Sequence, residues 1–416
     1  MIRPRLSPAL LAALLLQTAA ATVETPTAGA QRAAGNSGQG RTVAVGDVHG
    51  SLDGLLAILK ASQLVGEKGE WIGGAATLVQ TGDYTDRGPN VREVFDVLMR
   101  LEREASRAGG RVHVLFGNHE AMNLLHEFPD VSPQTFKAFA DARSEDRRRR
   151  AYKEYGQVLK KRGAPPISEE EWMAAHPAGF IEYTDALAPG GRYGRWLRSK
   201  KAAINEGGTI FMHAGLAPDL QGSIDDLNRT VARDLETWER GKEALVRAGL
   251  IRPFFTRQET QEAAIAELER IALLIKERRP AEDYVTQSYV EWLQAIASIG
   301  KSSLLDANGP LWFRGLAQWP DEEEPKVAEI LKRFDATRIV IGHTPVLPGA
   351  IKVRFGNRVF LIDTGMLAAV YKTGRPSALE LSASGAKAIY TTGTEVLVQT
   401  AEPLSAPRVL VAIDRN

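Results

Sequence analysis

The sequence lacks cysteine entirely, and this absence removes a whole class of chemistry. None of its 416 residues offers a thiol that could form a disulfide, act as a nucleophile or bind zinc as a thiolate. The side chains of His, Asp, Glu and Asn are therefore left as metal ligands. The chain also lacks a large net charge, because 52 Lys and Arg residues nearly balance 51 Asp and Glu residues and give a formal charge of +1. This balance indicates no nucleic-acid partner and no anionic membrane surface.

Long hydrophobic runs are absent beyond the first residues. Two arginines precede an apolar stretch over residues 9–16, and small residues follow over 18–21, a pattern typical of a cleavable signal peptide. The apolar stretch is shorter than the ~20 residues of an ordinary membrane helix. We therefore expect a signal peptide over 1–21 and a small, polar linker over 22–40. This predicts export to a bacterial periplasm, or secretion, without a stable membrane span; a retained N-terminal anchor is the alternative.

The segment after the linker, 41–416, is expected to form one α/β domain. Alternating apolar and amphipathic segments over 41–126 predict a βαβαβα unit, and therefore a sheet covered by helices with ligands at the carboxyl ends of its strands. Charged helical stretches at about 127–200 and 222–300 are expected to be insertions that form a cap. From residue 336 onward, β-branched segments separated by turns predict a second sheet built from hairpins. The sequence contains no internal repeat.

The short stretch GDVHG, residues 46–50, follows an apolar run and carries two potential ligands. Side chains two residues apart in an extended segment point to the same side, so Asp47 and His49 can converge on one ion. The pattern of apolar run, glycine and potential ligand recurs at Asp83, Asn118 and His343, and a further apolar run ends at His213. Glycine at a strand end allows a sharp turn and a close approach of the backbone to a bound ion.

These six side chains are too many for one tetrahedral zinc ion. They suit two metal ions ~3.5–4 Å apart that share one carboxylate, as in binuclear phosphatases. The sequence therefore predicts a binuclear metal centre at the strand ends. His, Asp and Asn ligands suit manganese, iron or zinc, and the sequence does not decide among these metals.

Five motifs in this order, GDVHG, GDYTDRG, GNHE, HAGL and GHT, resemble the signature of calcineurin-like metallophosphoesterases, in the phosphoprotein phosphatase branch. GNHEAMN (117–123) and GPLWFRG (309–315) further resemble the bacterial-type group called Shewanella-like phosphatases. The motifs span residues 46–343, whereas the two charged helical stretches match nothing in the family pattern. The resemblance implies a metallophosphoesterase-type sandwich of two β-sheets flanked by helices, and a phosphoprotein or small phosphomonoester as substrate.

The resemblance also implies a role for each residue of the metal centre. Asp47, His49 and Asp83 are expected to bind the first ion. Asp83 is expected to bridge to the second ion, which Asn118, His213 and His343 complete. A hydroxide that bridges the two ions would then attack phosphorus in line with the leaving group.

Four further residues are implied to act on the substrate. His119 is expected to be the general acid for the leaving oxygen, with Asp86 as the partner that keeps it protonated. Arg87 and Arg314 are expected to clamp the phosphate, which Asn118 also contacts.

Three positions near these motifs leave alternatives open. Glu120 either pairs with Arg87 or serves as a favourable carboxylate at a helix N-terminus. Trp312 and Phe313 either wall the substrate cleft or pack beneath it. Asp363 is expected to hydrogen-bond to a ligand histidine.

The expected function is hydrolysis of phosphomonoesters, with phosphoserine, phosphothreonine and phosphotyrosine all open as targets. One alternative is a nucleotide phosphohydrolase that resembles the diadenosine tetraphosphatases, although its third motif reads GNHD where this chain has GNHE. The other is a non-catalytic phosphate-binding module built on an inactive phosphatase fold.

Overall fold

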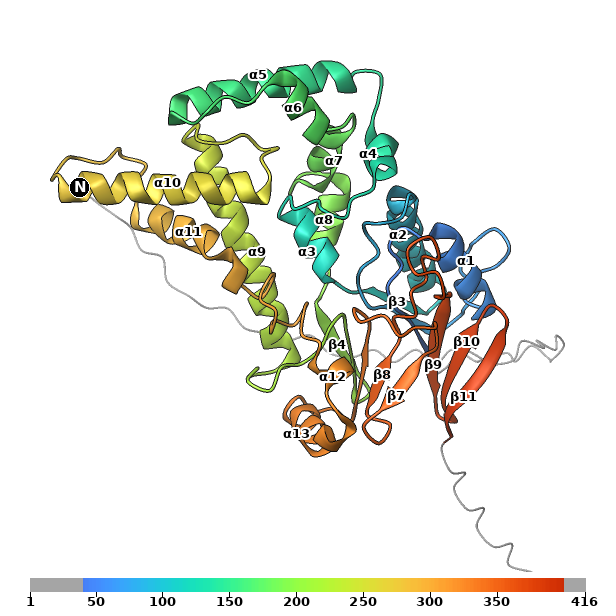
Figure 1. Cartoon of the computed structure of the whole chain (residues 1–416). Helices are drawn as coiled ribbons and strands as arrows, with labels where there is room; N and C mark the ends of the chain where they lie inside the picture. Colours follow the sequence, from blue (N-terminus) through green and yellow to red (C-terminus); the bar gives the residue numbers. More distant parts are fainter. Residues whose placement is uncertain (1–39, 400–416) are drawn as a thin grey trace, which may run out of the picture. The chain divides into compact units, whose positions relative to one another are not determined.

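The structure is a computed structural model that describes residues 40–399, so the predicted signal peptide and almost all of the predicted linker lie outside the described residues. Two mixed β-sheets form the centre of this part of the chain (Figure 1). The first sheet has the strand order β11-β10-β9-β1-β2-β3. Its strands are β1 (Thr42–Val45), β2 (Thr77–Gln80), β3 (Arg111–Val114), β9 (Ser377–Ser382), β10 (Gly385–Tyr390) and β11 (Gly393–Gln399).

The second sheet has the strand order β4-β5-β6-β8-β7. Its strands are β4 (Ala203–Glu206), β5 (Thr209–Met212), β6 (Arg338–Ile341), β7 (Lys352–Arg354) and β8 (Val359–Leu361). The expectation of a second sheet built from hairpins is only partly met. β5, β6 and β8 are parallel, and the hairpin strands β9 to β11 extend the first sheet, antiparallel to β1. A hairpin pattern in the sequence predicts which neighbouring strands pair, but not which sheet the hairpin joins. The sheet is decided by pairing between residues more than 300 positions apart in sequence, such as Val43 and Glu380.

The alternation of side chains along the strands builds two cores. On β1, Ala44 faces the second sheet, where Phe211 and Phe360 fill the space between the sheets. Its neighbours Val43 and Val45 face the opposite way and belong to the larger core under the helices. Both phenylalanines are buried, and full burial of such a side chain contributes about 1.5–3 kcal/mol. The predicted sandwich of two sheets flanked by helices is therefore confirmed.

The helices α1 (Leu52–Ala61) and α2 (Val91–Arg107) cover the outer face of the first sheet (Figure 1). In α2 the buried side chains recur every three or four residues, at Val91, Val94, Phe95, Leu98, Leu101 and Ala105. This spacing places one apolar stripe against the sheet, as the amphipathic pattern of the sequence predicts. The third helix, α3 (Asn118–Leu124), is buried along its whole length.

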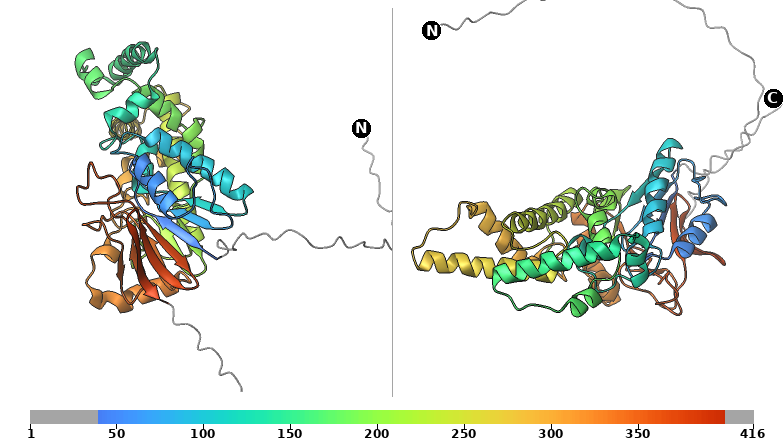
Figure 2. Two further views of the ribbon diagram at one scale, coloured as in Figure 1. Left: turned by 90° about the vertical axis from the view of Figure 1, so that its right-hand side faces the viewer. Right: turned by 90° about the horizontal axis from the view of Figure 1, so that it is seen from above.

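The two charged stretches fold as helices that extend beyond the sandwich (Figure 2). The first contains α4 (Pro133–Phe139), α5 (Ser144–Arg162), α6 (Glu169–Ala175), α7 (Phe180–Leu187) and α8 (Arg192–Arg198), and the second contains α9 (Ile224–Arg247), α10 (Arg257–Lys276) and α11 (Gln287–Ala297). Two smaller helices, α12 (Gly315–Gln318) and α13 (Glu324–Arg333), follow before β6. The Asn228 side chain ties α9 to β4, because its Oδ1 accepts from the backbone N–H groups of Ala202 and Ala203 at 2.9 and 3.0 Å.

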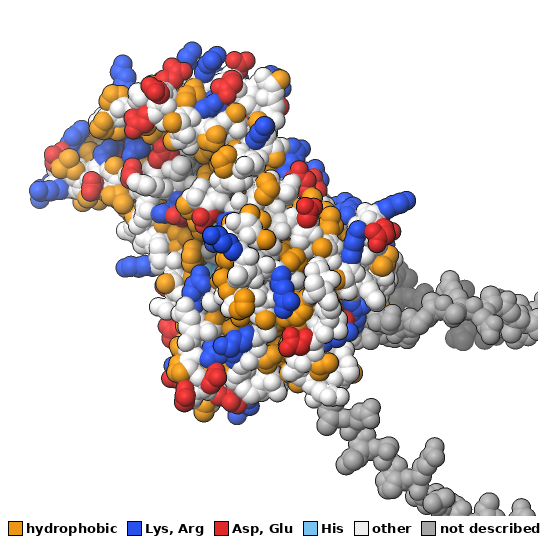
Figure 3. Space-filling model, turned by 45° about the vertical axis from the view of Figure 1, so that its right-hand side comes forward, with side chains coloured by type: hydrophobic (Ala, Val, Ile, Leu, Met, Phe, Trp, Pro, Cys, Tyr) orange, Lys and Arg blue, Asp and Glu red, His pale blue; other side chains and the backbone are white. Residues whose placement is uncertain are grey.

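The surface of the described residues carries charges of both signs. Figure 3 shows Lys and Arg side chains interspersed with Asp and Glu side chains on one face, with no extended area of a single sign. Over residues 40–399, none of the helices combines the length and the apolar character that a membrane crossing requires.

Candidate metal centre and active site

The sequence-predicted metal ligands come from six positions, and the structure brings all of them together. Asp47 and His49 follow β1, Asp83 follows β2, Asn118 begins α3, His213 follows β5 and His343 follows β6. Each of the six residues is at most 5 % exposed. Both sheets thus present the carboxyl ends of their parallel strands at one place, where ligands bind in α/β proteins.

In one half of the site, four side-chain atoms direct their lone pairs toward one another. The Nδ1 atom of His213 lies 3.1 Å from the carbonyl oxygen of Thr81, which fixes the proton on Nδ1 and leaves Nε2 as an acceptor. This Nε2 lies 2.8 Å from Oδ1 of Asn118, 3.0 Å from Nδ1 of His343 and 3.2 Å from Oδ2 of Asp83. The Nε2 atom of His343 lies 3.1 Å from the carbonyl of Trp312, so His343 Nδ1 is an acceptor as well.

These four atoms have no proton to share, and they would repel one another without a positive charge between them. A metal ion supplies that charge, and neutral imidazole, amide oxygen and carboxylate are all suitable ligands for it. The donor set therefore fits a transition-metal ion. Carbonyl partners that fix the tautomer of each imidazole are typical of metal-binding histidines.

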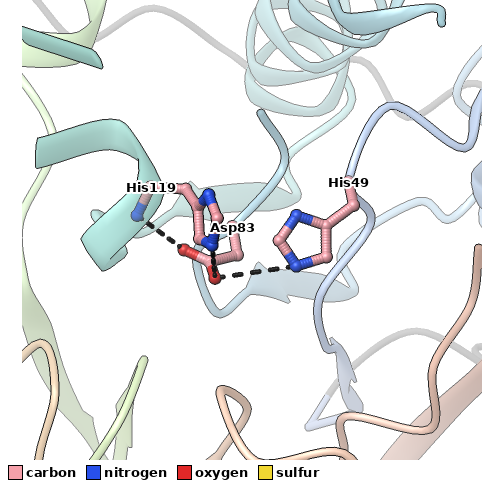
Figure 4. Close-up of side chains that lie close together, drawn as sticks. All are labelled: His49, Asp83 and His119. Carbon is pink, nitrogen blue, oxygen red and sulfur yellow. Dashed lines mark hydrogen bonds and ion pairs between the residues drawn. The ribbon is translucent and has the colours of Figure 1, made fainter. Parts of the chain in front are cut away.

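The other half of the site is centred on His49. The His49 Nδ1 atom lies 2.9 Å from the carbonyl of Thr85, so Nε2 is again the acceptor. His49 Nε2 lies 3.9 Å from Oδ2 of Asp47 and 3.8 Å from Oδ2 of Asp83. Figure 4 shows the rings of His49 and His119 directed at the Asp83 carboxylate, which lies between them. Asp83 is thus the residue that both halves of the site share.

Unfavourable negative charge accumulates around Asp47, in the half of the site that contains His49. Burial, together with the carboxylates of Asp363 and Asp83, raises the pKa of Asp47 well above its ordinary value. Within residues 40–399 the buried Oδ2 atom of Asp363 has no hydrogen-bond partner. An orphaned carboxylate oxygen beside two more carboxylates is the environment that a bound cation stabilises.

His119 follows Asn118 in α3, but its side chain contacts different residues. Its Nδ1 atom lies 2.7 Å from Oδ2 of Asp86, while its Nε2 atom lies 3.8 Å from Oδ2 of Asp83. By distance alone His119 groups with His49 and Asp83 as a potential ligand. Burial lowers the pKa of His119, but the carboxylates of Asp83 and Asp86 outweigh burial and raise this pKa to about 9. A carboxylate on Nδ1 favours the protonated ring, which can donate a proton.

Asp86 is itself held in place by the first helical insertion. Nδ2 of Asn123 donates to Oδ1 of Asp86 at 2.8 Å, and the hydroxyl of Tyr183 on α7 donates to Oδ1 of Asn123 at 2.6 Å. Sequence reasoning missed both residues. Asn123 lies one helical turn after His119, and this spacing could have indicated that the two side chains are neighbours. Tyr183 lies on a helix that matches no motif, so no sequence pattern indicated it.

A pocket of about 170 Å³ opens above the metal centre. Both predicted phosphate clamps line it, together with Trp312, Tyr371 and Asp130. Nη1 of Arg314 donates to the carbonyl of His343 at 2.8 Å, and Arg87 contacts the hydroxyl of Tyr371. The volume is below the ~300–1,000 Å³ of pockets for drug-sized ligands, so the pocket suits a single small group such as phosphoryl.

Strained backbone concentrates at the site. Five non-glycine residues there have positive φ angles: His49 (45°), Asp83 (56°), Asp86 (67°), Arg87 (62°) and His343 (67°). Each such conformation costs of the order of 1–3 kcal/mol and persists where function requires it. Glycine allows the close approach of neighbouring strands, since a Cβ at Gly342 would lie 2.2 Å from Oδ1 of Asp47.

The structure selects between the open alternatives at two neighbouring sites and corrects the expectation for Asp363. Glu120 forms no hydrogen bond to Arg87 within the described residues and lies in the first turn of α3, as its second alternative states. Its carboxylate accepts from the backbone N–H groups of Gly117, Asp83, Tyr84 and Thr85 at 2.8 to 3.1 Å and so fixes the loop after β2. The carboxylate of Asp363 faces Asp47 rather than a ligand histidine. Trp312 lines the pocket, whereas Phe313 is buried and packs against Trp319.

Comparison with known proteins gives a consistent result. Residues 40–347 match the family model described as calcineurin-like phosphoesterase. The chain is 30% identical to an uncharacterised protein of Schizosaccharomyces pombe over 329 residues, 78% of this chain and 73% of that protein. It is 24% identical to Shewanella-like protein phosphatase 1 of Plasmodium berghei, over 79% of this chain and 67% of that one.

The crystal structure of a cold-active protein-tyrosine phosphatase of a psychrophilic Shewanella species has a similar fold. The TM-score is 0.53 at 22% identity, and the match covers 87% of this chain and 81% of that one. This similarity supports the arrangement of two sheets and flanking helices described above.

Proposed function

We propose, because this chain belongs to the calcineurin-like phosphoesterase family, that it is a binuclear-metal phosphomonoesterase acting on phosphoproteins. The observation that carries the proposal is the set of four facing lone pairs on His213, His343, Asn118 and Asp83. Such a set stabilises a cation, and within residues 40–399 no Lys or Arg forms an ion pair with Asp83. The family implies divalent metal ions, and we propose manganese, iron or zinc from the ligand types.

Two groups of residues would hold the ions. The first group is Asp47, His49 and Asp83, and the second is Asp83, Asn118, His213 and His343. Ions bound there would activate the attacking water and neutralise phosphate charge. The pocket above them admits the phosphoryl group and keeps the rest of a large substrate outside.

The remaining residues of the pocket act directly on the substrate. The guanidinium groups of Arg87 and Arg314 lie on the pocket wall, where their N–H groups can bind phosphoryl oxygens. His119 donates a proton to the leaving oxygen as the phosphorus–oxygen bond breaks, and Asp86 holds the ring in the orientation for this transfer. Asn118 contributes its amide to the same pocket.

The proposed substrate class is argued from two exposed apolar residues near the pocket lining in sequence and from the names of the relatives. Leu347 and Val370 are 50 % and 48 % exposed, and each lies within two residues of a pocket-lining residue, Pro345 or Tyr371. Exposed apolar side chains close in sequence to the pocket lining suit a peptide that presents one phosphorylated side chain. The names of the relatives, protein phosphatase and protein-tyrosine phosphatase, support the same class and leave the phosphoamino acid open.

Activity profiling of the metal-reconstituted protein tests the proposal. We expect turnover of phosphoserine or phosphotyrosine peptides, and much slower turnover of a phosphodiester or of diadenosine tetraphosphate. A preference for the dinucleotide would establish the nucleotide phosphohydrolase instead, and phosphate binding without any turnover would establish the binding module. His213→Ala, which removes one of the four lone pairs, is the control that separates this enzyme from a contaminating phosphatase.

We further propose that the chain is exported, on the basis of the signal-peptide pattern over residues 1–21. Expression of the full chain in a bacterium, followed by fractionation and N-terminal sequencing, tests this. We expect a periplasmic product that begins near residue 22, and an intact N-terminus in the cytoplasm would contradict export.

A further inference from the structure

A second, larger cavity lies in the helical insertions. Its volume is about 620 Å³, and it shares no lining residue with the pocket above the metal centre. Its lining comes from α3, α7, α8 and α9 and from the loops next to them. Apolar side chains form much of the wall, among them Leu124, Pro189, Val246 and Pro253. The size falls within the range of small-molecule binding sites.

The cavity contains a partly buried amine that lacks an anionic partner. The Nζ atom of Lys242 lies 2.9 Å from Nδ1 of His126 and 3.0 Å from the carbonyl oxygen of Phe255. Over residues 40–399 no carboxylate lies within ion-pair distance of this Nζ atom. An amine in this setting is costly to keep charged, because neither a neutral imidazole nor a carbonyl neutralises it.

The acidic side chains around the cavity already have partners. Glu239 pairs with Arg198 at 2.6 Å, Glu236 pairs with Arg240 at 2.5 Å, and Glu243 pairs with Arg247 at 2.7 Å. Of the four carboxylates that line the cavity, only Asp185 has no ion pair within the described residues, and it does not reach Lys242. The charge at Lys242 is therefore open to an external anion.

A hydrogen-bond donor without a partner lies beside Lys242. Trp238 is one turn earlier on α9, so the two side chains are neighbours on one face of the helix. Trp238 is 1 % exposed and lines the cavity, and its Nε1–H group has no hydrogen-bond partner in the described part of the chain. A buried donor left unpaired costs about 1–3 kcal/mol, which an acceptor on a ligand would recover.

We propose that this cavity binds a small amphipathic carboxylate whose head group pairs with Lys242 and accepts from Trp238. The apolar wall takes the hydrocarbon part of such a ligand. The site is separate from the proposed phosphatase centre, and the proposal does not depend on that function. Burial lowers the pKa of Lys242 to about 7, which supports the proposal because a bound carboxylate would favour the charged amine.

Calorimetric titration of the full chain with decanoate tests the site. Inorganic phosphate at saturating concentration keeps the carboxylate off the metal centre. We expect one saturable site and, at pH 8, uptake of close to one proton per decanoate, measured in two buffers that differ in ionisation heat. At pH 6 Lys242 is already charged, so proton uptake should nearly vanish.

Matched variants separate the head-group contact from general apolar binding. Lys242→Met, which keeps the length of the side chain, should weaken decanoate at least about tenfold and leave the neutral analogue decanol unaffected. Trp238→Phe, which removes the N–H group and keeps an aromatic ring, should weaken decanoate less. Lys161→Met, at an exposed lysine whose Nζ contacts the carbonyl of Ala248, should change nothing.

Three results would overturn the proposal. They are equal decanoate affinity in wild type and Lys242→Met, absence of saturable decanoate binding, and binding at pH 8 without proton uptake. The last measurement uses wild-type protein, so the proposal stays open to refutation even where a variant fails to fold.

Discussion

The Oδ2 atom of Asp86 lies 2.7 Å from Nδ1 of His119, and this contact is the inner end of a longer chain of hydrogen bonds. Asn123 donates to the same carboxylate, and the Tyr183 hydroxyl donates to Asn123. All four residues are buried. A helix of the first insertion, α7, therefore supports the orientation of the residue that we propose as the general acid.

Replacement of His119 should separate acid catalysis from phosphate binding. His119→Asn should lower kcat for a phosphoserine peptide by roughly 10²–10⁴, because a serine alkoxide cannot leave without a proton. The loss should be much smaller for p-nitrophenyl phosphate, whose leaving group is a stable phenolate. Steady-state kinetics on both substrates, with metal content measured in parallel, make the comparison.

The control for this experiment is Arg87→Ala. Loss of a phosphate clamp should slow both substrates by similar factors, since the clamp acts on the phosphoryl group that they share. Equal losses for both leaving groups in His119→Asn, or a loss of bound metal, would show that His119 positions phosphate or binds an ion instead.

Tyr183→Phe tests the outer end of the hydrogen-bond chain. The change removes only a hydroxyl that lies 2.6 Å from Asn123, so we expect a stability loss of about 1 kcal/mol in chemical denaturation. Turnover of phosphoserine should fall by a smaller factor than in His119→Asn, with p-nitrophenyl phosphate again less affected. A purely structural tyrosine would lower stability and leave the ratio of the two rates unchanged.

Removal of metal should abolish activity, because the nucleophile of the expected reaction is a water activated by the metal ions and not a side chain. Chelation followed by dialysis should give inactive protein, and manganese, zinc or iron should restore turnover. Substantial turnover by protein shown to be metal-free by elemental analysis would contradict this expectation.

Asp83→Asn should reduce the binding of both ions at once, since the Asp83 carboxylate is within 3.8 Å of His49 and 3.2 Å of His213. Asp47→Asn is the matched comparison, because Asp47 is proposed to hold only one ion. Two tightly bound ions per chain in Asp83→Asn, measured by elemental analysis, would exclude this residue as the bridge.

Much of the centre was accessible from the sequence because its ligands follow apolar runs. A ligand directly after a parallel strand lies at the carboxyl edge of its sheet, so Asp47 and Asp83 had to meet once β1 paired with β2, and His213 and His343 once β5 paired with β6. The packing of the two sheets against each other then brings the two pairs together. The fold class and the class of enzyme, a metal-dependent phosphatase, are confirmed by the family match. The individual site roles, the domain limits and the export of the chain stay predictions.

Other features depend on contacts that no local pattern encodes. The hairpin strands β9 to β11 join the first sheet through pairing with β1, and this choice is settled by burial between distant segments. Tyr371 and Asp130 reach the pocket from loops, and Tyr183 reaches Asn123 from an insertion without a recognisable motif. The contact between Lys242 and His126 likewise joins two helical regions that are 116 positions apart in sequence.

The partly buried amine of Lys242 should also make stability depend on pH in a specific direction. In the folded protein, burial lowers the pKa of Lys242 from 10.5 to about 7. The charged and titratable groups that act on this amine are His126, Glu239, Glu259 and Arg198. Between these two pH values the unfolded chain binds a proton at this lysine and the folded chain does not. Stability therefore rises with pH over this window, by at most about 1.4 kcal/mol per pH unit from this one group.

Lys242→Met isolates that contribution, because every other titrating group is common to both proteins. We expect the variant to be more stable than wild type at pH 6, where wild type must bury a charged amine. The difference in the free energy of unfolding should shrink steadily from pH 7 to pH 10, as measured by urea denaturation at each pH. A difference that stays constant over this range would mean that Lys242 keeps its proton in the folded protein. Saturating decanoate should produce such a constant difference, because the bound carboxylate would hold the amine in its charged form.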